Sequence, residues 1–188
     1  IDNVIINNNT GSNAGGGIFI DNNTSTILDH VTLYNNSSND GGGISIASTD
    51  WNSYYTNVNI NNSIFYNNSP ETFGSGYDNT NDYKDIVFSY SDVFLSDSDS
   101  IIDGVGNINS RPWFCDSGND NFALADQSPC KIAGKGGTYM GAYGPGGCGE
   151  VFSGCMESQA CNFCEECNIN NESTCQYPLE NTDCNGNC

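Results

Sequence analysis

The stretch NAGGGIFI at residues 13–20 returns as NDGGGISI at residues 39–46, which is 26 residues further along the chain. In both copies a glycine triplet precedes an apolar-x-apolar segment. Glycine adopts positive φ angles and allows two backbones to approach closely, so each triplet predicts a tight corner that leads into a short strand. Two copies at this spacing are typical of a fold that stacks repeated units.

A second sequence frame has a similar period. The nine residues that begin at Ile1 align with those that begin at Leu28 and Ile60, and a shorter copy begins at Phe88. The steps between copies are 27, 32 and 28 residues. Polar positions two and three predict a corner, and the alternation after them predicts a strand with one face in the core. The positions expected to face the core are Ile1, Val4 and Ile6; Leu28, Val31 and Leu33; Ile60, Ser63 and Phe65; and Phe88, Ser91 and Val93.

Stacking of these copies leads to expectations about neighbours. Ile6 and Leu33 should pair on adjacent parallel strands, and the two glycine corners should stack. The ninth position of the frame is asparagine three times, at Asn9, Asn36 and Asn68. Asparagine side chains about 4.8 Å apart in successive repeats can hydrogen-bond to one another, so we expect a ladder there.

The glycine corners and the strands VTLYNN (31–36) and SIFYNN (63–68) resemble the coils of a right-handed parallel β-helix of the pectin-lyase-like type. The resemblance covers residues 1–147 and is to secreted bacterial β-helix and adhesin-like proteins. It implies an all-β solenoid that residues 106–147 close. The segments similar to the closing part of that family are, in order, 87–93, 106–114, 121–124, 128–134 and 141–143.

Residues 148–188 form a second predicted domain, which is dense in Cys, Asn and Glu. They resemble short Cys-rich modules of secreted bacterial surface proteins, which often precede a C-terminal sorting domain of the type IX secretion route. The motifs that carry this resemblance are GC (154–155), ACNF (160–163), STCQYP (173–178) and DCNGNC (183–188). CEEC at 164–167 stands where that family usually has a plain acidic loop. About 40 residues bury too little apolar surface to fold alone, so disulfides should staple the module.

Composition and charge point to an extracellular protein. The 188 residues carry a net charge of −19 with only four Lys and Arg, which argues against nucleic acid or anionic lipid as partners. No apolar run is long enough to span a bilayer, so no membrane insertion is expected. Ten cysteines indicate an oxidising compartment and hence a secreted or cell-surface location.

The chain begins inside a repeat. We therefore expect further coils of the same chain, or another surface protein, to lie against the edge formed by Ile1, because open edges recruit other strands.

The cysteines are predicted to form disulfides. Cys115 and Cys130 flank a turn-rich segment and are expected to pair, the alternative being two buried thiols. The remaining cysteines should pair among themselves, with the connectivity left open. They are Cys148, Cys155, Cys161, Cys164, Cys167, Cys175, Cys184 and Cys188. An alternative for the run from Cys161 to Cys167 is a zinc or iron–sulfur site completed by Cys155 or Cys175.

Calcium is a possible cofactor. Asp97, Asp99 and Asp103 precede a glycine turn and offer hard oxygen ligands, with Asp183, Asn185 and Asn187 as a weaker second candidate. The alternative is that both are solvated acidic loops.

Aromatic loops that interrupt the frame are candidates for glycan binding. They contain Trp51, Tyr54, Tyr55 and Tyr77. Insertions in a solenoid often build its binding face, and such rings can stack on sugars. The alternative is that the rings cover the edge of a sheet.

Asp2 and Asp29 share the second position of the frame and should stack one repeat apart. Carboxylates about 5 Å apart can serve as acid and nucleophile in a glycosidase. Asp29 and His30 are neighbours in sequence and are expected to point apart, so they would not form a relay. No Lys or Arg precedes Lys84, so the base that a β-helix lyase needs is missing from these repeats.

We therefore assign no catalytic residue. The sequence predicts a non-catalytic extracellular β-helix protein with an adhesive or structural role, the C-terminal part of a longer secreted protein or fibre. The alternatives are a polysaccharide-degrading lyase or glycosidase whose groove lies in further coils, and a carbohydrate-binding module that uses the aromatic loops.

Overall fold

The computed structural model describes residues 1–21, 24–46, 56–74, 84–93, 101–164, 167, 169–178 and 184. This part of the chain is all-β, with short 3-10 turns and no α-helix. No helix in it is long and apolar enough to cross a membrane.

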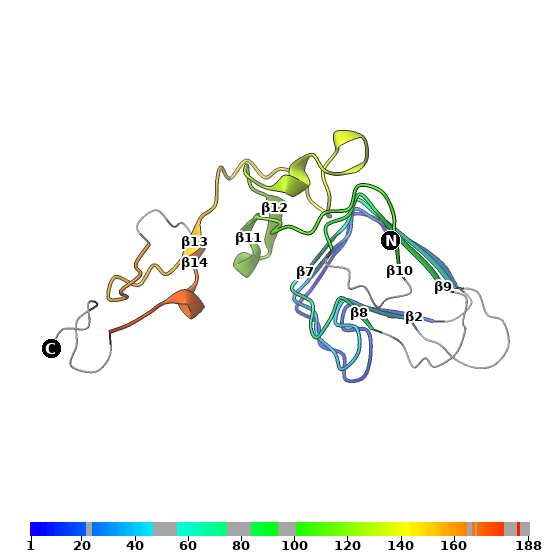
Figure 1. Ribbon diagram of the computed structural model, residues 1–188, viewed down its shortest axis with the longest axis horizontal. Helices are drawn as coiled ribbons and strands as arrows, with labels where there is room; N and C mark the ends of the chain where they lie inside the picture. The colour runs from blue at the N-terminus through cyan, green and yellow to red at the C-terminus, as the bar shows by residue number, and fades with distance from the viewer. Residues whose placement is uncertain are drawn as a thin grey trace.

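Three parallel sheets build the first part of the molecule (Figure 1). The first contains β1 (Ile5–Asn7), β4 (Thr32–Tyr34) and β7 (Ile64–Tyr66). The second contains β2 (Ile18–Ile20), β5 (Ile44–Ile46) and β8 (Phe73–Gly74). The third contains β3 (Ser25–Asp29), β6 (Thr56–Asn61), β9 (Lys84–Ser89) and β10 (Ile101–Asp103). Each of the first three repeats thus adds one strand to every sheet, and these repeats stack.

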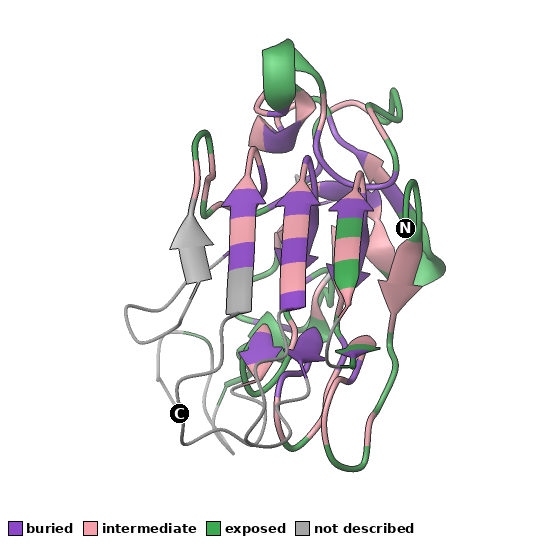
Figure 2. Ribbon diagram, turned by 90° about the vertical axis from the view of Figure 1, so that its right-hand side faces the viewer, coloured by how far each residue is buried: buried purple, intermediate pink, exposed green. Residues whose placement is uncertain are grey.

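The register of the strands confirms the neighbours that the sequence frame predicts. Of the positions expected to face the core, Ile1 and Val4 are instead exposed, at 54% and 37%, because they lie on the outermost repeat. Ile6 pairs with Leu33, and Leu33 pairs with Phe65 on the next strand. Apolar side chains from all three sheets meet in one core, which includes Leu33, Ile44 and Ile60. Strand β6 alternates between buried and half-buried residues, as the period of two predicts. Figure 2 shows this alternation as bands along the neighbouring strands.

The glycine corners stack as expected. The Gly16 N–H donates to the Gly41 carbonyl at 3.1 Å, and the Gly17 N–H donates to the Gly42 carbonyl at 3.0 Å. A Cβ atom on Gly42 would lie 2.2 Å from the Ser69 carbonyl oxygen of the next repeat. The corner is therefore glycine because the backbones of adjacent repeats touch there.

The expected asparagine ladder is present. The Asn9 amide donates to Asn36 Oδ1 at 3.0 Å, and the Asn36 amide donates to Asn68 Oδ1 at 3.0 Å. Asn36 is fully buried and also donates to the Ile6 carbonyl and accepts from the Asn9 N–H. The Asn36 side chain thus supplies hydrogen-bond partners to backbone groups of the neighbouring repeat, at a corner where strand pairing supplies none.

The closing segment, residues 106–147, lies mainly along the side of the stack. Its first residues continue the stack, because the Ile108 N–H donates to Ser91 and the Val93 N–H donates to Ile108. From β11 (Phe114–Asp116) and β12 (Asn121–Leu124) onward it covers the outer face of the β1-β4-β7 sheet (Figure 1). This second core joins Ile64 of the sheet to Phe114, Phe122, Leu124, Cys130 and Met140. These residues were expected to close the solenoid, but their main contact is with the outer face of the β1-β4-β7 sheet.

The disulfides correct one predicted pair. Cys115 bonds Cys148, and Cys130 is a buried free thiol. The reason is the path of residues 144–146 beside β12: the Leu124 N–H donates to Gly144, and the Gly146 N–H donates back to Leu124. This route brings Cys148 to Cys115, across the proposed boundary at residue 148. The prediction that the last eight cysteines pair only among themselves is therefore wrong.

The Cys-rich module contains three further disulfides, Cys155–Cys175, Cys161–Cys184 and Cys164–Cys167. All the cysteines proposed for a zinc or iron–sulfur site are thus in disulfides and offer no thiolate ligand. Cys188 lies outside the described residues. The module also holds a short parallel pair, β13 (Ser153–Gly154) and β14 (Ile169–Asn170). Disulfides at this density are typical of proteins that fold in an oxidising, extracellular compartment.

Candidate functional site: an aromatic cleft beside the stack

A cleft of about 370 Å³ lies where the β1-β4-β7 sheet, the closing segment and the Cys-rich module meet. Its lining combines aromatic rings with amide and hydroxyl groups, which is the mixture that ligand pockets use for affinity and orientation. The described lining residues are Tyr34, Tyr66, Asn67, Arg111, Pro112, Trp113, Phe114, Ser117, Gly118, Val151, Ser153, Ile169 and Asn171.

Two tyrosines at the same frame position form one wall. The rings of Tyr34 and Tyr66 are nearly parallel, with an interplanar angle of 13° and centroids 6.4 Å apart. Tyr34 is fixed by an edge-on contact with Phe114 at 5.8 Å and by a hydrogen bond that its hydroxyl accepts from Ser117 Oγ at 3.3 Å. Both rings remain half-buried, so part of their surface is open to the cleft.

Arg111 and Trp113, from the closing segment, also line the cleft. The guanidinium carbon of Arg111 lies 4.2 Å from the centroid of the Trp113 ring, a cation–π contact. Arg111 is exposed and forms no ion pair within the described part of the chain. The described lining contains no carboxylate, although the chain has 23 acidic residues. Rigid rings, amides and one cation make this cleft suited to a polar ligand with flat apolar faces.

A second polar group lies at the first corner of the frame. Asp2 and Asp29 are bridge partners on adjacent repeats, as their shared position predicts. His30 Nδ1 lies 3.2 Å from Asp29 Oδ1, so the expectation that these neighbours point apart is wrong. The reason is the left-handed backbone at His30, with φ of 50°, which turns the chain between the two side chains.

A third site is a buried pair that joins the stack to the closing segment. Asp92 is 2% exposed; its Oδ2 atom lies 3.2 Å from Cys130 Sγ, and its Oδ1 atom accepts the Ser110 N–H at 2.9 Å. Burial raises the pKa of Asp92 to about 6, although the two hydrogen bonds oppose this. Burial, and next the charge of Asp92, also raises the pKa of the Cys130 thiol. A thiol with a raised pKa is a poor nucleophile, so this pair is structural.

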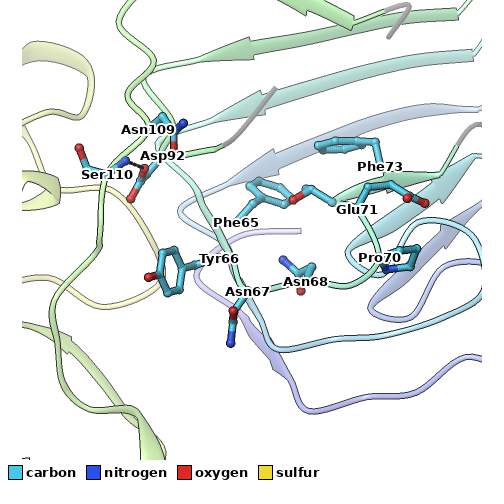
Figure 3. A pocket seen from close by; sticks show the side chains of 11 residues that line it. Phe65, Tyr66, Asn67, Asn68, Pro70, Glu71, Phe73, Asp92, Asn109 and Ser110 are labelled. Atoms are coloured by element: carbon cyan, nitrogen blue, oxygen red, sulfur yellow. Dashed lines mark hydrogen bonds between the residues drawn. The ribbon is translucent and has the colours of Figure 1, made fainter. Parts of the chain in front are cut away.

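Asp92 also borders a pocket of about 260 Å³ between β7, β8 and residues 109–110 (Figure 3). Phe65 and Phe73 line its apolar side, and Figure 3 shows Asp92 hydrogen-bonded to Ser110 at the other end. Glu71 Oε1 accepts the Gly41 N–H at 2.9 Å. Both carboxylates of this pocket thus hold backbone groups.

Most site residues proposed from sequence fall outside the described part of the chain. Trp51, Tyr54, Tyr55 and Tyr77 lie outside it, as do Asp97, Asp99, Asp183, Asn185 and Asn187. Asp103 lies in β10, whose side chains are not described. Glycan and calcium binding by these residues stay predictions.

Sequence reasoning missed the residues of the cleft itself. Tyr34 and Tyr66 recur before the asparagine pair in LYNN and FYNN, and this repetition of an outward aromatic residue was an available signal. Trp113 carries no such signal, because only the fold of the closing segment brings it to the sheet.

Comparison of the chain with models of known protein families, with curated proteins and with solved structures gave no match.

Proposed function

We propose that the three parallel sheets are the walls of a right-handed parallel β-helix of the pectin-lyase-like type in a secreted or cell-surface protein. The disulfide-stapled module after it is of the kind that accompanies type IX secretion cargo. Stacking of one strand per sheet in each of the first three repeats supports the first part, and the disulfide density supports secretion of the module into an oxidising compartment.

The role that we propose is adhesion without catalysis, through carbohydrate bound in the aromatic cleft. The observation that carries this proposal is the lining of the cleft. Tyr34 and Tyr66 offer neighbouring rings one repeat apart, and Trp113 faces the same space from another element. Amides and hydroxyls at Asn67, Ser153 and Asn171 supply donors and acceptors for sugar hydroxyls.

A glycan array followed by titration of the best ligand tests this role. We expect saturable binding, and a weakening of about tenfold in Trp113→Ala, because one aromatic contact contributes about 1–1.5 kcal/mol. Tyr143→Ala is the matched control, since Tyr143 is 52% exposed and is not among the lining residues. Equal binding by the wild type and Trp113→Ala, or no glycan binding at all, would contradict the proposal.

A polysaccharide-degrading enzyme is the second candidate, and the stacked carboxylates of Asp2 and Asp29 favour it. The same glycans should then release reducing ends over time, and Asp29→Asn should stop the release. We expect no release from the wild type.

A further inference from the structure

We propose that Asp2, Asp29 and His30 form a binding site for a divalent first-row transition-metal cation, for which Zn²⁺ is the probe. The inference is independent of glycan binding in the cleft.

The three ligands come together across two repeats. One oxygen of each carboxylate and one ring nitrogen of His30 all lie within 4.8 Å of one another. The bridge between Asp2 and Asp29 fixes this approach, since the backbones are paired at that point. The set combines two carboxylates with an imidazole, and nitrogen ligands favour zinc and its neighbours over calcium, which takes oxygen ligands.

Contacts behind the ligands hold two of them in place. Asn62, from the third repeat, donates its amide to Asp29 Oδ1 at 2.9 Å, and its own oxygen accepts the Lys135 N–H at 2.8 Å. The Tyr139 ring and the His30 imidazole pack edge to face, with centroids 5.1 Å apart. Such outer contacts orient ligands at metal sites, and here they come from separate elements.

The existing distances suit coordination. In a tetrahedral zinc site with ligands at about 2.1 Å, neighbouring ligand atoms are about 3.4 Å apart. His30 Nδ1 and Asp29 Oδ1 are already 3.2 Å apart. Asp2 is exposed, and Asn3 holds only its Oδ1 atom, at 2.9 Å, so rotation of the Asp2 side chain completes the third position. Water takes the fourth.

His30 is the only histidine of the chain, which makes the test direct. Zn²⁺ is titrated into metal-free, oxidised protein without a histidine tag, and the imidazole is followed by long-range ¹H–¹⁵N NMR. We expect the His30 nitrogen signals to shift and to saturate at one equivalent, whereas Ca²⁺ at the same concentration should leave them unchanged. An unchanged spectrum with Zn²⁺, or an equal response to Ca²⁺, would overturn the proposal.

Variants separate this site from adventitious binding. Asp2→Asn should weaken Zn²⁺ binding at least tenfold in calorimetry, whereas Glu157→Gln removes the same charge from an exposed position and should change nothing. His30→Asn should abolish binding, and asparagine suits the backbone because Asn3 and Asn62 have φ of 52° and 47° at the equivalent corners. If His30→Asn does not fold, Asp2→Asn decides, because Asp2 is exposed. Wild-type affinity in a folded Asp2→Asn protein would refute the assignment.

Discussion

At the scale of single residues, Asp92 makes stability depend on pH. Its pKa rises from an ordinary 3.8 to about 6 in the folded protein, so between these values the folded state keeps a proton that the unfolded state loses. The contribution of Asp92 to the free energy of unfolding is therefore fully present below about pH 4 and is lost as the pH rises through 6. The loss amounts to about 3 kcal/mol at most. We expect Asp92→Asn, which stays neutral and can still accept the Ser110 N–H, to lack this loss.

Urea unfolding of the wild type and Asp92→Asn between pH 4 and 7 measures the loss. The wild type should lose stability relative to the variant as the pH rises. Parallel curves of stability against pH would show that Asp92 is not the cause.

At the scale of elements, the glycine corners fix how closely the repeats stack. In Gly42→Ala the new methyl group would lie 2.2 Å from the Ser69 carbonyl oxygen and 2.5 Å from its nitrogen, both backbone atoms that cannot turn away. We expect the free energy of unfolding to fall by about 2–3 kcal/mol. Gly118→Ala is the control, because its nearest neighbour is a side-chain oxygen at 3.6 Å, and it should stay within about 0.5 kcal/mol of the wild type. A loss of the same size in both variants, read from chemical denaturation, would show that the stacked corner is not the cause.

The strands and corners were predictable because they depend on local rules. A period of two places Leu33 and Phe65 inside, and a glycine triplet makes a corner whatever surrounds it. The cover over the β1-β4-β7 sheet was not predictable in this way. It depends on which distant segment meets outward residues such as Ile64, and no local pattern encodes that choice. The cleft was missed for the same reason, since its lining comes from three separate parts of the chain, namely the sheet, the closing segment and the Cys-rich module.

At the scale of the whole molecule, the Cys115–Cys148 bond ties the Cys-rich module to the body of the protein and leaves Cys130 unpaired. Cys130 is fully buried and its pKa is raised, so both access and thiolate content are low. We expect iodoacetamide to leave Cys130 unlabelled in the native protein and to label it completely in denaturant without reductant. Peptide mapping by mass spectrometry reads both states. A peptide pair that joins Cys115 to Cys130 would contradict the Cys115–Cys148 bond.

The asparagine ladder also bears on how such a chain can change its length. The step from Asn9 to Asn36 is 27 residues and the step from Asn36 to Asn68 is 32, yet both pairs hydrogen-bond at 3.0 Å. The hydrogen bond between stacked asparagines therefore aligns each repeat at its corner, whatever the number of residues between one corner and the next. In related proteins one loop could therefore be longer, or a whole repeat could be duplicated. The asparagine side-chain amide would still align each added repeat with its neighbour. The surface loops can then vary while the core stays the same, because loops and core are built from different positions of the same repeat.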